Sequence, residues 1–260
     1  MTILRHRRLA ALVAVAAFAT ACSDASTGPS DVQPLELSEV LAQLQPSSLA
    51  PLQPQLSAAP VAGLAAPNPS SCSYDAATRS FVCPNVSVTG ITVSRSFTLL
   101  DASGTPQTQY DKSSTAAVRM KSAFAGTVTS GASTFTVDQA QDVTLSGLLT
   151  GVHTLNGTSL GHLVGPFGNG TTTTPIATTV SATITNLVLP RSSTGADRFP
   201  KSGTITATTA TTIGALPTFT GTATITFNGT SHAAVVVTAG GQTTSCTVDL
   251  SATTATFCTR

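Results

Sequence analysis

The 260-residue chain is short of the side chains on which many recognition surfaces depend. It contains no tryptophan and only two tyrosines, and charged residues make up 9% of it. Sugar-binding platforms normally stack sugar rings on tryptophan or tyrosine, and membrane-spanning barrels carry aromatic girdles at both interfaces. The scarcity of these rings therefore disfavours both classes of protein.

Charge is also scarce, and its distribution argues against nucleic acid as a partner. The formal net charge is +1, but Arg5, Arg7 and Arg8 all lie in the first eight residues. Without these three, nine basic residues stand against eleven acidic ones, so the net charge of the remaining chain is −2. The basic residues form no run of the kind that binds phosphate backbones, and we expect no nucleic-acid partner.

Glutamate is absent after residue 70, which limits carboxylate and metal chemistry. The only glutamates are Glu36 and Glu39, and the carboxylates after residue 70 are Asp75, Asp101, Asp111, Asp138, Asp142, Asp197 and Asp249. A zinc protease of the H-E-x-x-H type is excluded, and a glycosidase would need two opposed carboxyl groups from these scattered aspartates. We expect no cofactor and no metal centre.

What the chain does have, at its beginning, is the layout of an export signal. The basic residues 5–8 precede an apolar run from Leu9 to Ala19 that is too short to span a bilayer comfortably. The segment Ala19-Thr20-Ala21-Cys22 resembles the lipobox of bacterial lipoproteins. This resemblance implies cleavage before Cys22 and acylation of its thiol and amine. Ordinary secretion is the alternative, because Ala19-x-Ala21 also fits a plain signal peptidase.

The number of cysteines supports the lipoprotein resemblance. Removing Cys22 from the five cysteines leaves an even set: Cys72, Cys83, Cys246 and Cys258. A leftover thiol in an exported protein needs an explanation, which acylation supplies. At about 0.8 kcal/mol per buried CH₂, two or three chains such as palmitate hold a protein on a membrane. Since Ser23 follows the cysteine instead of aspartate, the resemblance implies anchoring in the outer membrane of the bacterial cell envelope.

Composition divides the chain into a signal peptide (1–21), a lipidated cysteine with a tether (22–71), and a folded domain (72–260). Eight of the fifteen prolines fall in the tether, and proline at this density favours extended chain. One stretch differs, because Leu37, Val40, Leu41 and Leu44 share a helical face. It is either a short helix docked on the domain or an apolar part of the linker.

Two hairpins closed by cysteines are predicted at the ends of the folded domain. A turn at Ala77-Thr78 places Cys72 opposite Cys83, with Tyr74 opposite Phe81. A turn around Ala252 places Cys246 opposite Cys258. Four cysteines allow three pairings, and we expect the two local disulfides, with cross-links between the termini as the alternative.

The segments between these hairpins alternate with period two. Phe219, Ala223, Ile225 and Phe227 share one face of a strand, threonines occupy the other, and Asn228-Gly229 then predicts a tight turn. Further strands are predicted at 107–111, 116–128, 133–146, 177–189, 202–213, 231–237 and 243–250. The stretch 85–100 is interpreted as one long strand with a bulge at Gly90.

No stretch after residue 70 has helical periodicity of useful length, so the predicted fold is all-β. An antiparallel meander forming a β-sandwich or a partly open curled barrel, preceded by a proline-rich tether, fits the pattern. About a quarter of the residues from Asp101 onward are threonine, which suits an exposed pleated surface.

Gly157-Thr-Ser-Leu-Gly161 matches the G-x-S-x-G elbow of serine hydrolases. Ser159, Asp197 and His232 follow in hydrolase order, but the elbow requires a strand-to-helix turn, and no helix is expected here. Ester hydrolysis lost in a Ser159→Ala variant would indicate a hydrolase. We expect no enzyme and retain this only as a distant alternative.

Two other local patterns are weaker still. A hairpin turn at Asn156-Gly157 would place His153 and His162 on one face, but a closed metal site needs three or four ligands. Gly165-Pro-Phe-Gly-Asn-Gly170 lacks the lysine and helix of a phosphate-binding loop, and a flexible loop is expected there.

Two functional classes therefore remain. The first is a lipid-anchored, monomeric β-domain with a binding or structural role at the cell envelope, through its threonine-rich face and loops. The second is a carrier that holds an apolar ligand inside a curled sheet, as periplasmic lipid-handling lipoproteins do. The membrane, through the acyl chains on Cys22, is the one partner expected in both cases.

Overall fold

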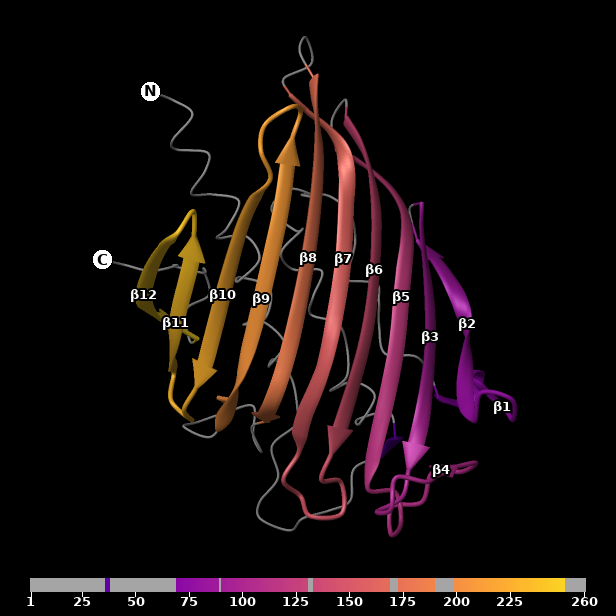
Figure 1. Ribbon diagram of the computed structural model, residues 1–260. Coiled ribbons are helices and arrows are strands. Elements are labelled where there is room, and N and C mark those ends of the chain that lie inside the picture. The colour runs from indigo at the N-terminus through magenta and orange to yellow at the C-terminus, as the bar shows by residue number, and fades with distance from the viewer. Residues whose placement is uncertain are drawn as a thin grey trace.

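Alternating side chains and frequent turn residues build one antiparallel sheet in the computed structural model (Figure 1). The structure describes residues 36–37, 69–88, 90–130, 133–168, 173–189 and 199–250. A 3₁₀ turn, η4 (Pro69–Ser71), precedes twelve strands: β1 (Ser73–Asp75), β2 (Ser80–Val88), β3 (Ile91–Leu100), β4 (Pro106–Gln107), β5 (Ala117–Ser130), β6 (Ser133–Ser146), β7 (Thr154–Gly168), β8 (Thr173–Val188), β9 (Ser202–Ile213), β10 (Phe219–Phe227), β11 (His232–Ala239) and β12 (Gln242–Asp249). Among these residues, no helix is long and apolar enough to cross a membrane.

The strands follow one another across the sheet in chain order, apart from β4, which pairs only with β3. The predicted all-β antiparallel meander is confirmed. Of the two architectures considered, the described strands form one curled, open sheet and not the two layers of a sandwich. The central strands β7 and β8 lie nearest the viewer while both edges recede (Figure 1). The path ends at β1 and β12, so the sheet stays open.

Several strands begin and end where the alternation predicts. β6 and β9 have the predicted bounds, and the C-terminal meander of β10, β11 and β12 is confirmed. Gly229 adopts a φ of +82° in the predicted turn, a left-handed conformation that glycine adopts without strain. In contrast, the predicted strand 107–111 is reduced to the two residues of β4.

The interpretation of residues 85–100 as one strand is wrong. Gly90 has a φ of +86° and lies at a reversal of the chain, so that β2 and β3 pair as an antiparallel hairpin. The bulge lies in β2, between Cys83 and Val86. At the bulge the alternation of side chains in β2 shifts by one residue, and the pairing with β3 continues on both sides of it.

The expected turn at Asn156-Gly157 is also wrong, and so is the expected loop as far as Gly168. These residues lie within β7, which pairs with β6 on one side and with β8 on the other, whereas residues 169 and 170 lie outside the described residues. The Asn-Gly pair occupies a register shift between Leu155 and Gly157. The Asn156 side-chain oxygen accepts a hydrogen bond of 2.7 Å from the backbone N–H of Asn186 on β8. A dipeptide that often makes turns therefore makes a bulge when neighbouring strands satisfy its hydrogen bonds.

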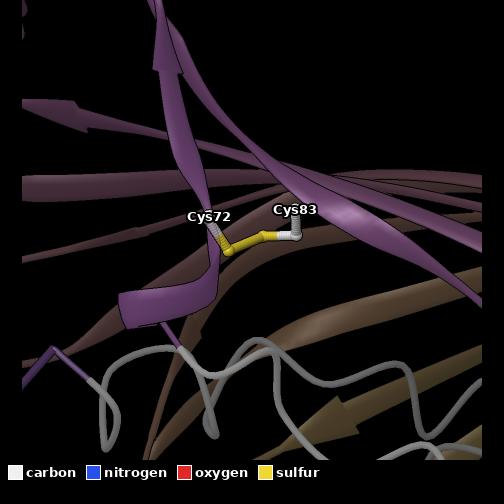
Figure 2. Close-up of a disulfide and its surroundings, with 2 residues drawn as sticks. All are labelled: Cys72 and Cys83. Atoms are coloured by element: carbon white, nitrogen blue, oxygen red, sulfur yellow. A yellow bond between two sulfur atoms is a disulfide. The ribbon is translucent and has the colours of Figure 1, made fainter.

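The N-terminal hairpin is confirmed in detail. β1 pairs with β2, Tyr74 lies opposite Phe81 with ring centroids 5.3 Å apart, and a disulfide joins Cys72 to Cys83 (Figure 2). Phe81 also stacks on Phe97 of β3, which attaches the hairpin to the sheet. Cys246 is a disulfide cysteine as well. Its predicted partner Cys258 lies outside the described residues, as do Cys22 and the predicted signal peptide.

The beginning of the predicted Leu37–Leu44 helix contacts the domain. Leu37 packs against a core cluster that contains Phe97 and Val118, and Glu36 forms an ion pair with Lys112 in the connection between β4 and β5. These contacts agree with the docked alternative at this point of the chain. Val40, Leu41 and Leu44 lie outside the described residues.

Candidate binding site on the concave face

The strand register arranges the side chains of the buried face in rows that cross the sheet. One apolar row passes through β3, β5, β6, β7, β8, β9, β10 and β11 and contains Phe97, Met120, Val143, Gly157, Ile184, Ile205, Ile225 and Val235. Side chains on the inner side of a curled sheet converge, so we place these buried rows on the concave face. Leu99, Val118 and Leu145, from the neighbouring row, are fully buried.

A set of polar side chains interrupts this apolar surface. Directly beside the apolar row lie Arg95 of β3, Ser122 of β5, Gln141 of β6 and Ser159 of β7, which face one another across four neighbouring strands. Gln139 of β6 belongs to the next row. We call these five residues the polar band. They come from strand positions whose parity points to the core, where apolar side chains are usual.

Hydrogen bonds link the members of the polar band in pairs. The Gln139 amide donates to the Ser159 hydroxyl at 2.8 Å, and the Ser122 hydroxyl lies 3.4 Å from the Gln141 side-chain oxygen, to which it donates. Ser122 and Gln139 are buried. Because buried polar groups are tolerated mainly when they are hydrogen-bonded, these pairs keep the band compatible with its apolar surroundings.

Arg95 carries the only charge on the buried face of the described strands β2–β12. Its exposure is 9%, and desolvation by burial lowers the pKa of its guanidinium from the ordinary value. Removing a cation from water costs several kcal/mol unless other groups compensate. In this structure Arg95 also interacts with another group of the chain, which offsets part of that cost.

Apolar clusters flank the polar band on both sides. Along β3, Val93 precedes Arg95 and Phe97 follows it; along β5, Phe124 and Met120 enclose Ser122 in the same way. Across β8, β9 and β10 the row of the band continues as Ala182, Ala207 and Ala223. On the concave face, the polar band of one cation and four hydrogen-bonding side chains thus lies beside a row of small residues between larger apolar ones, and Thr209 and Thr211 of β9 add further buried hydroxyls.

The convex face has a different composition, dominated by threonine. Pairing aligns hydroxyl side chains, nearly all of them threonines, into rows that cross separate strands. Examples are Thr158–Thr183–Thr206–Thr224, Thr185–Thr204–Thr226 and Ser181–Thr208–Thr222–Thr238–Thr243. Some hydroxyls lie within hydrogen-bond distance of each other, including Thr206 and Thr224 at 3.3 Å. The strands β8, β9 and β10 contain no charged residue.

Charge on the convex face is concentrated on β5 and β6. Arg119 donates through Nε to the Asp142 carboxylate at 2.7 Å, and a second guanidinium nitrogen donates to the other carboxylate oxygen. This hydrogen-bonded pair holds the pKa of Asp142 below its ordinary value and raises that of Arg119. Both side chains are partly exposed, which is the usual setting of a surface ion pair.

The polar band and the threonine rows are thus the two surfaces with distinctive chemistry. No family model, no curated protein and no solved structure matches this chain. The first surface combines one buried charge with apolar area. The second surface offers hydroxyl and methyl groups without charge.

The structure does not bring the suggested hydrolase residues together. Ser159 lies in the middle of β7, where its hydroxyl accepts a hydrogen bond from Gln139, whereas the serine of a catalytic triad donates to a histidine. His232 lies at the start of β11 and is exposed, with Ser231 as its hydroxyl neighbour, and Asp197 lies outside the described residues. A nucleophile elbow needs a strand-to-helix turn, and Ser159 is in a continuous strand.

The structure also separates the two histidines that were considered as a metal site. Because β7 runs straight through Asn156, His153 and His162 are roughly 30 Å apart along the extended chain. The Nδ1 atom of His162 instead lies 3.0 Å from the Thr179 hydroxyl. Among the described residues, no group of three or more His, Cys, Asp or Glu side chains is placed to hold a metal ion.

Sequence reasoning missed the polar band. Its one local signal is Arg95, which falls among Val93, Phe97 and Leu99 at positions that alternate as a buried strand. Ser122, Gln141 and Ser159 join it only through the register of three further strands. That long-range pairing cannot be read from local patterns.

Proposed function

We propose that this chain is an exported lipoprotein of the bacterial cell envelope, anchored in the outer membrane by acyl chains on Cys22. Its β-domain has a binding role and no catalytic one. The lipobox-like Ala19-Thr20-Ala21-Cys22 and the even number of remaining cysteines support the anchor. Replacing Cys22 by alanine is expected to move the protein from the membrane to the soluble fraction. Retention of that variant in the membrane fraction would contradict the anchor.

The ligand of this proposed domain is apolar or amphiphilic and lies on the concave face. The observation that supports this assignment is the single curled sheet, in which an apolar row crosses eight strands with no second sheet packed on it among the described strands. A sandwich would bury such a row against its other layer. In this structure most of the row is buried, and Leu37 packs against the cluster that contains Phe97, so an apolar molecule on the concave side would replace part of that cover.

Binding of radiolabelled oleyl alcohol to the full-length, delipidated protein tests this proposal. Ala207→Leu adds bulk to the concave face of β9 and is expected to weaken binding by about tenfold. Ala210→Leu changes the convex face of the same strand and is expected to leave binding unchanged. Absence of binding to the wild-type protein, or equal effects of the two variants, would contradict the concave site.

The threonine rows support a second candidate, a docking surface for an uncharged component of the envelope. Their side chains are β-branched and have few rotamers, so little conformational entropy is lost when a partner binds. Lysine at Thr206 and Thr224 is expected to reduce retention of the unanchored Cys22→Ala protein on isolated envelopes. Unchanged retention would remove this candidate.

A further inference from the structure

Two adjacent residues of the tether, Glu36 and Leu37, contact the folded domain in two different ways. Leu37, whose backbone is helical, packs against the core cluster of the concave face that contains Phe97 and Val118. Glu36 forms an ion pair with Lys112, which lies 76 residues further along the chain. An apolar contact beside a charge pair fixes both the place and the direction of the tether at this point.

We propose that Glu36 and Leu37 form a reversible latch, which fastens the tether to the domain and limits how far the domain lies from the membrane. The limit on distance rests on the proposed anchor at Cys22, whereas the latch itself does not. From Cys22 to Glu36 the chain advances by 14 residues, which reach at most about 50 Å. From Cys22 to Pro69, where η4 begins, it advances by 47 residues, which reach about 160 Å. The shorter reach applies when the latch is closed.

The turn that contains Lys112 is held in place by its own hydrogen bonds. One oxygen of the Asp111 carboxylate accepts hydrogen bonds from the backbone N–H and the hydroxyl of Ser113, and the other accepts one from the hydroxyl of Ser114. The backbone N–H of Ser114 donates to the carbonyl of Asp111 at 3.1 Å. Because both carboxylate oxygens of Asp111 are engaged in this way, they compete little with Glu36 for the Lys112 ammonium.

The strength of these contacts suits a latch that opens and closes. The Lys112 and Glu36 side chains are 42% and 65% exposed, so their ion pair is weak and is screened by salt. Leu37 is partly buried and contributes apolar area. Cys72 packs against the same cluster as Leu37, so closing the latch closes the chain between them into a loop, which costs entropy.

Proteolysis measures the opening of the latch, because Glu36 and Glu39 are the only glutamates of the chain. A glutamate-specific protease therefore cuts the full-length protein only in this segment. Where cleavage requires opening, its rate follows the population of the open form. In the wild type, we expect cleavage after Glu36 to be about tenfold slower than in a free peptide of residues 30–45.

Variants separate the two contacts of the latch. Lys112→Gln removes the ion pair and is expected to speed cleavage by about threefold. Leu37→Ser is expected to bring cleavage within about twofold of a free peptide with the same substitution. Lys121→Gln, on the convex face, is the matched control and should leave the rate unchanged. Salt of about 1 M should speed cleavage of the wild type relative to its peptide, but not cleavage of Lys112→Gln.

The outcomes distinguish the latch from the anchor. Cleavage of the wild type as fast as its peptide, or equal protection of wild type and Leu37→Ser relative to their peptides, overturns the latch. The mass of the C-terminal fragment reports cleavage whether or not Cys22 is acylated, so failure of the anchor leaves this test intact. Thermal melts of every variant verify that faster cleavage is not loss of fold.

Neutron reflectometry of the acylated protein on a supported bilayer tests the limit on distance. The gap between bilayer and domain is expected to be about twice as wide in Leu37→Ser as in the wild type, because the root-mean-square span of a chain grows with the square root of its length. Equal gaps would overturn the limit on distance.

Discussion

At the scale of single residues, the sheet depends on glycines at positions where two strands come too close for a side chain. Gly157 stands in the apolar row of the concave face, where every other member is large. A Cβ added there would lie 2.4 Å from the backbone oxygen of Asp142 and 2.7 Å from the Cα of Val143. Gly161, four residues further along β7, would place its Cβ no closer than 3.7 Å to any neighbouring atom.

These distances predict different costs for the same substitution. Gly157→Ala is expected to lower the free energy of unfolding by roughly 1–3 kcal/mol, because backbone atoms of β6 must shift. Gly161→Ala is expected to change it little, since its contacts are of ordinary length. Urea denaturation of both variants measures the difference. Equal stability of the two would contradict the close approach of β6 and β7 at Gly157.

The ion pair between Arg119 and Asp142 predicts a pH dependence. Its hydrogen bonds lower the pKa of Asp142 in the folded state, so the pair stabilises the protein above the unfolded-state pKa and this stability is lost as pH falls through the folded-state pKa. Because both side chains are more than about a third exposed, we expect no more than about 1 kcal/mol. Asp142→Asn should therefore lower stability near neutral pH, and this effect should shrink as the pH falls through the folded-state pKa.

Urea denaturation of wild type and Asp142→Asn across this pH range provides the measurement. Asp138→Asn is the matched control, since Asp138 lies on the same strand and face and, among the described residues, forms no ion pair. If the stability difference between wild type and Asp142→Asn grew toward low pH, the predicted direction of the pH dependence would be wrong.

At the scale of elements, the N-terminal hairpin shows how much local sequence can determine. The spacing of Cys72 and Cys83 and the pairing of Tyr74 with Phe81 follow from the alternation within a dozen residues, and the structure confirms both. The sequence predicts a bulge at Gly90 and a turn at Asn156-Gly157, whereas the structure has a turn at Gly90 and a bulge at Asn156. A glycine or an Asn-Gly pair serves equally well in a turn and in a bulge. Strands that are far away in the sequence determine whether a turn or a bulge forms.

This hairpin is expected to contribute measurably to stability. Removing the disulfide with a Cys72→Ala/Cys83→Ala double variant should lower the free energy of unfolding by about 3 kcal/mol, the loop-closure value for this span. The double variant leaves no unpaired thiol at the hairpin, and Cys246 remains disulfide-bonded. Guanidinium denaturation provides the measurement. An unchanged midpoint would show that the β1–β2 hairpin does not need its covalent closure.

At the scale of the whole molecule, the two faces of one sheet are chemically separated. In the described strands β2–β12, the charges other than Arg95 lie on the convex face together with the threonine rows, and the apolar rows with the polar band lie on the concave face. The alternation of single strands predicts that such faces exist. It does not predict that Arg95, Ser122, Gln141 and Ser159 align, because a shift of one residue in any strand would move its side chain to the other face.

The central claim is that the concave face holds the ligand, and a nitroxide-labelled stearic acid tests it most directly. In methyl NMR spectra of the full-length protein, the bound probe is expected to broaden the signals of Met120, Val143 and Ile205 more strongly than those of Thr206 and Thr224. The first three residues belong to the concave apolar row, and the two threonines belong to the convex rows. Stronger broadening of the threonine signals, or no selective broadening on either face, would contradict the account.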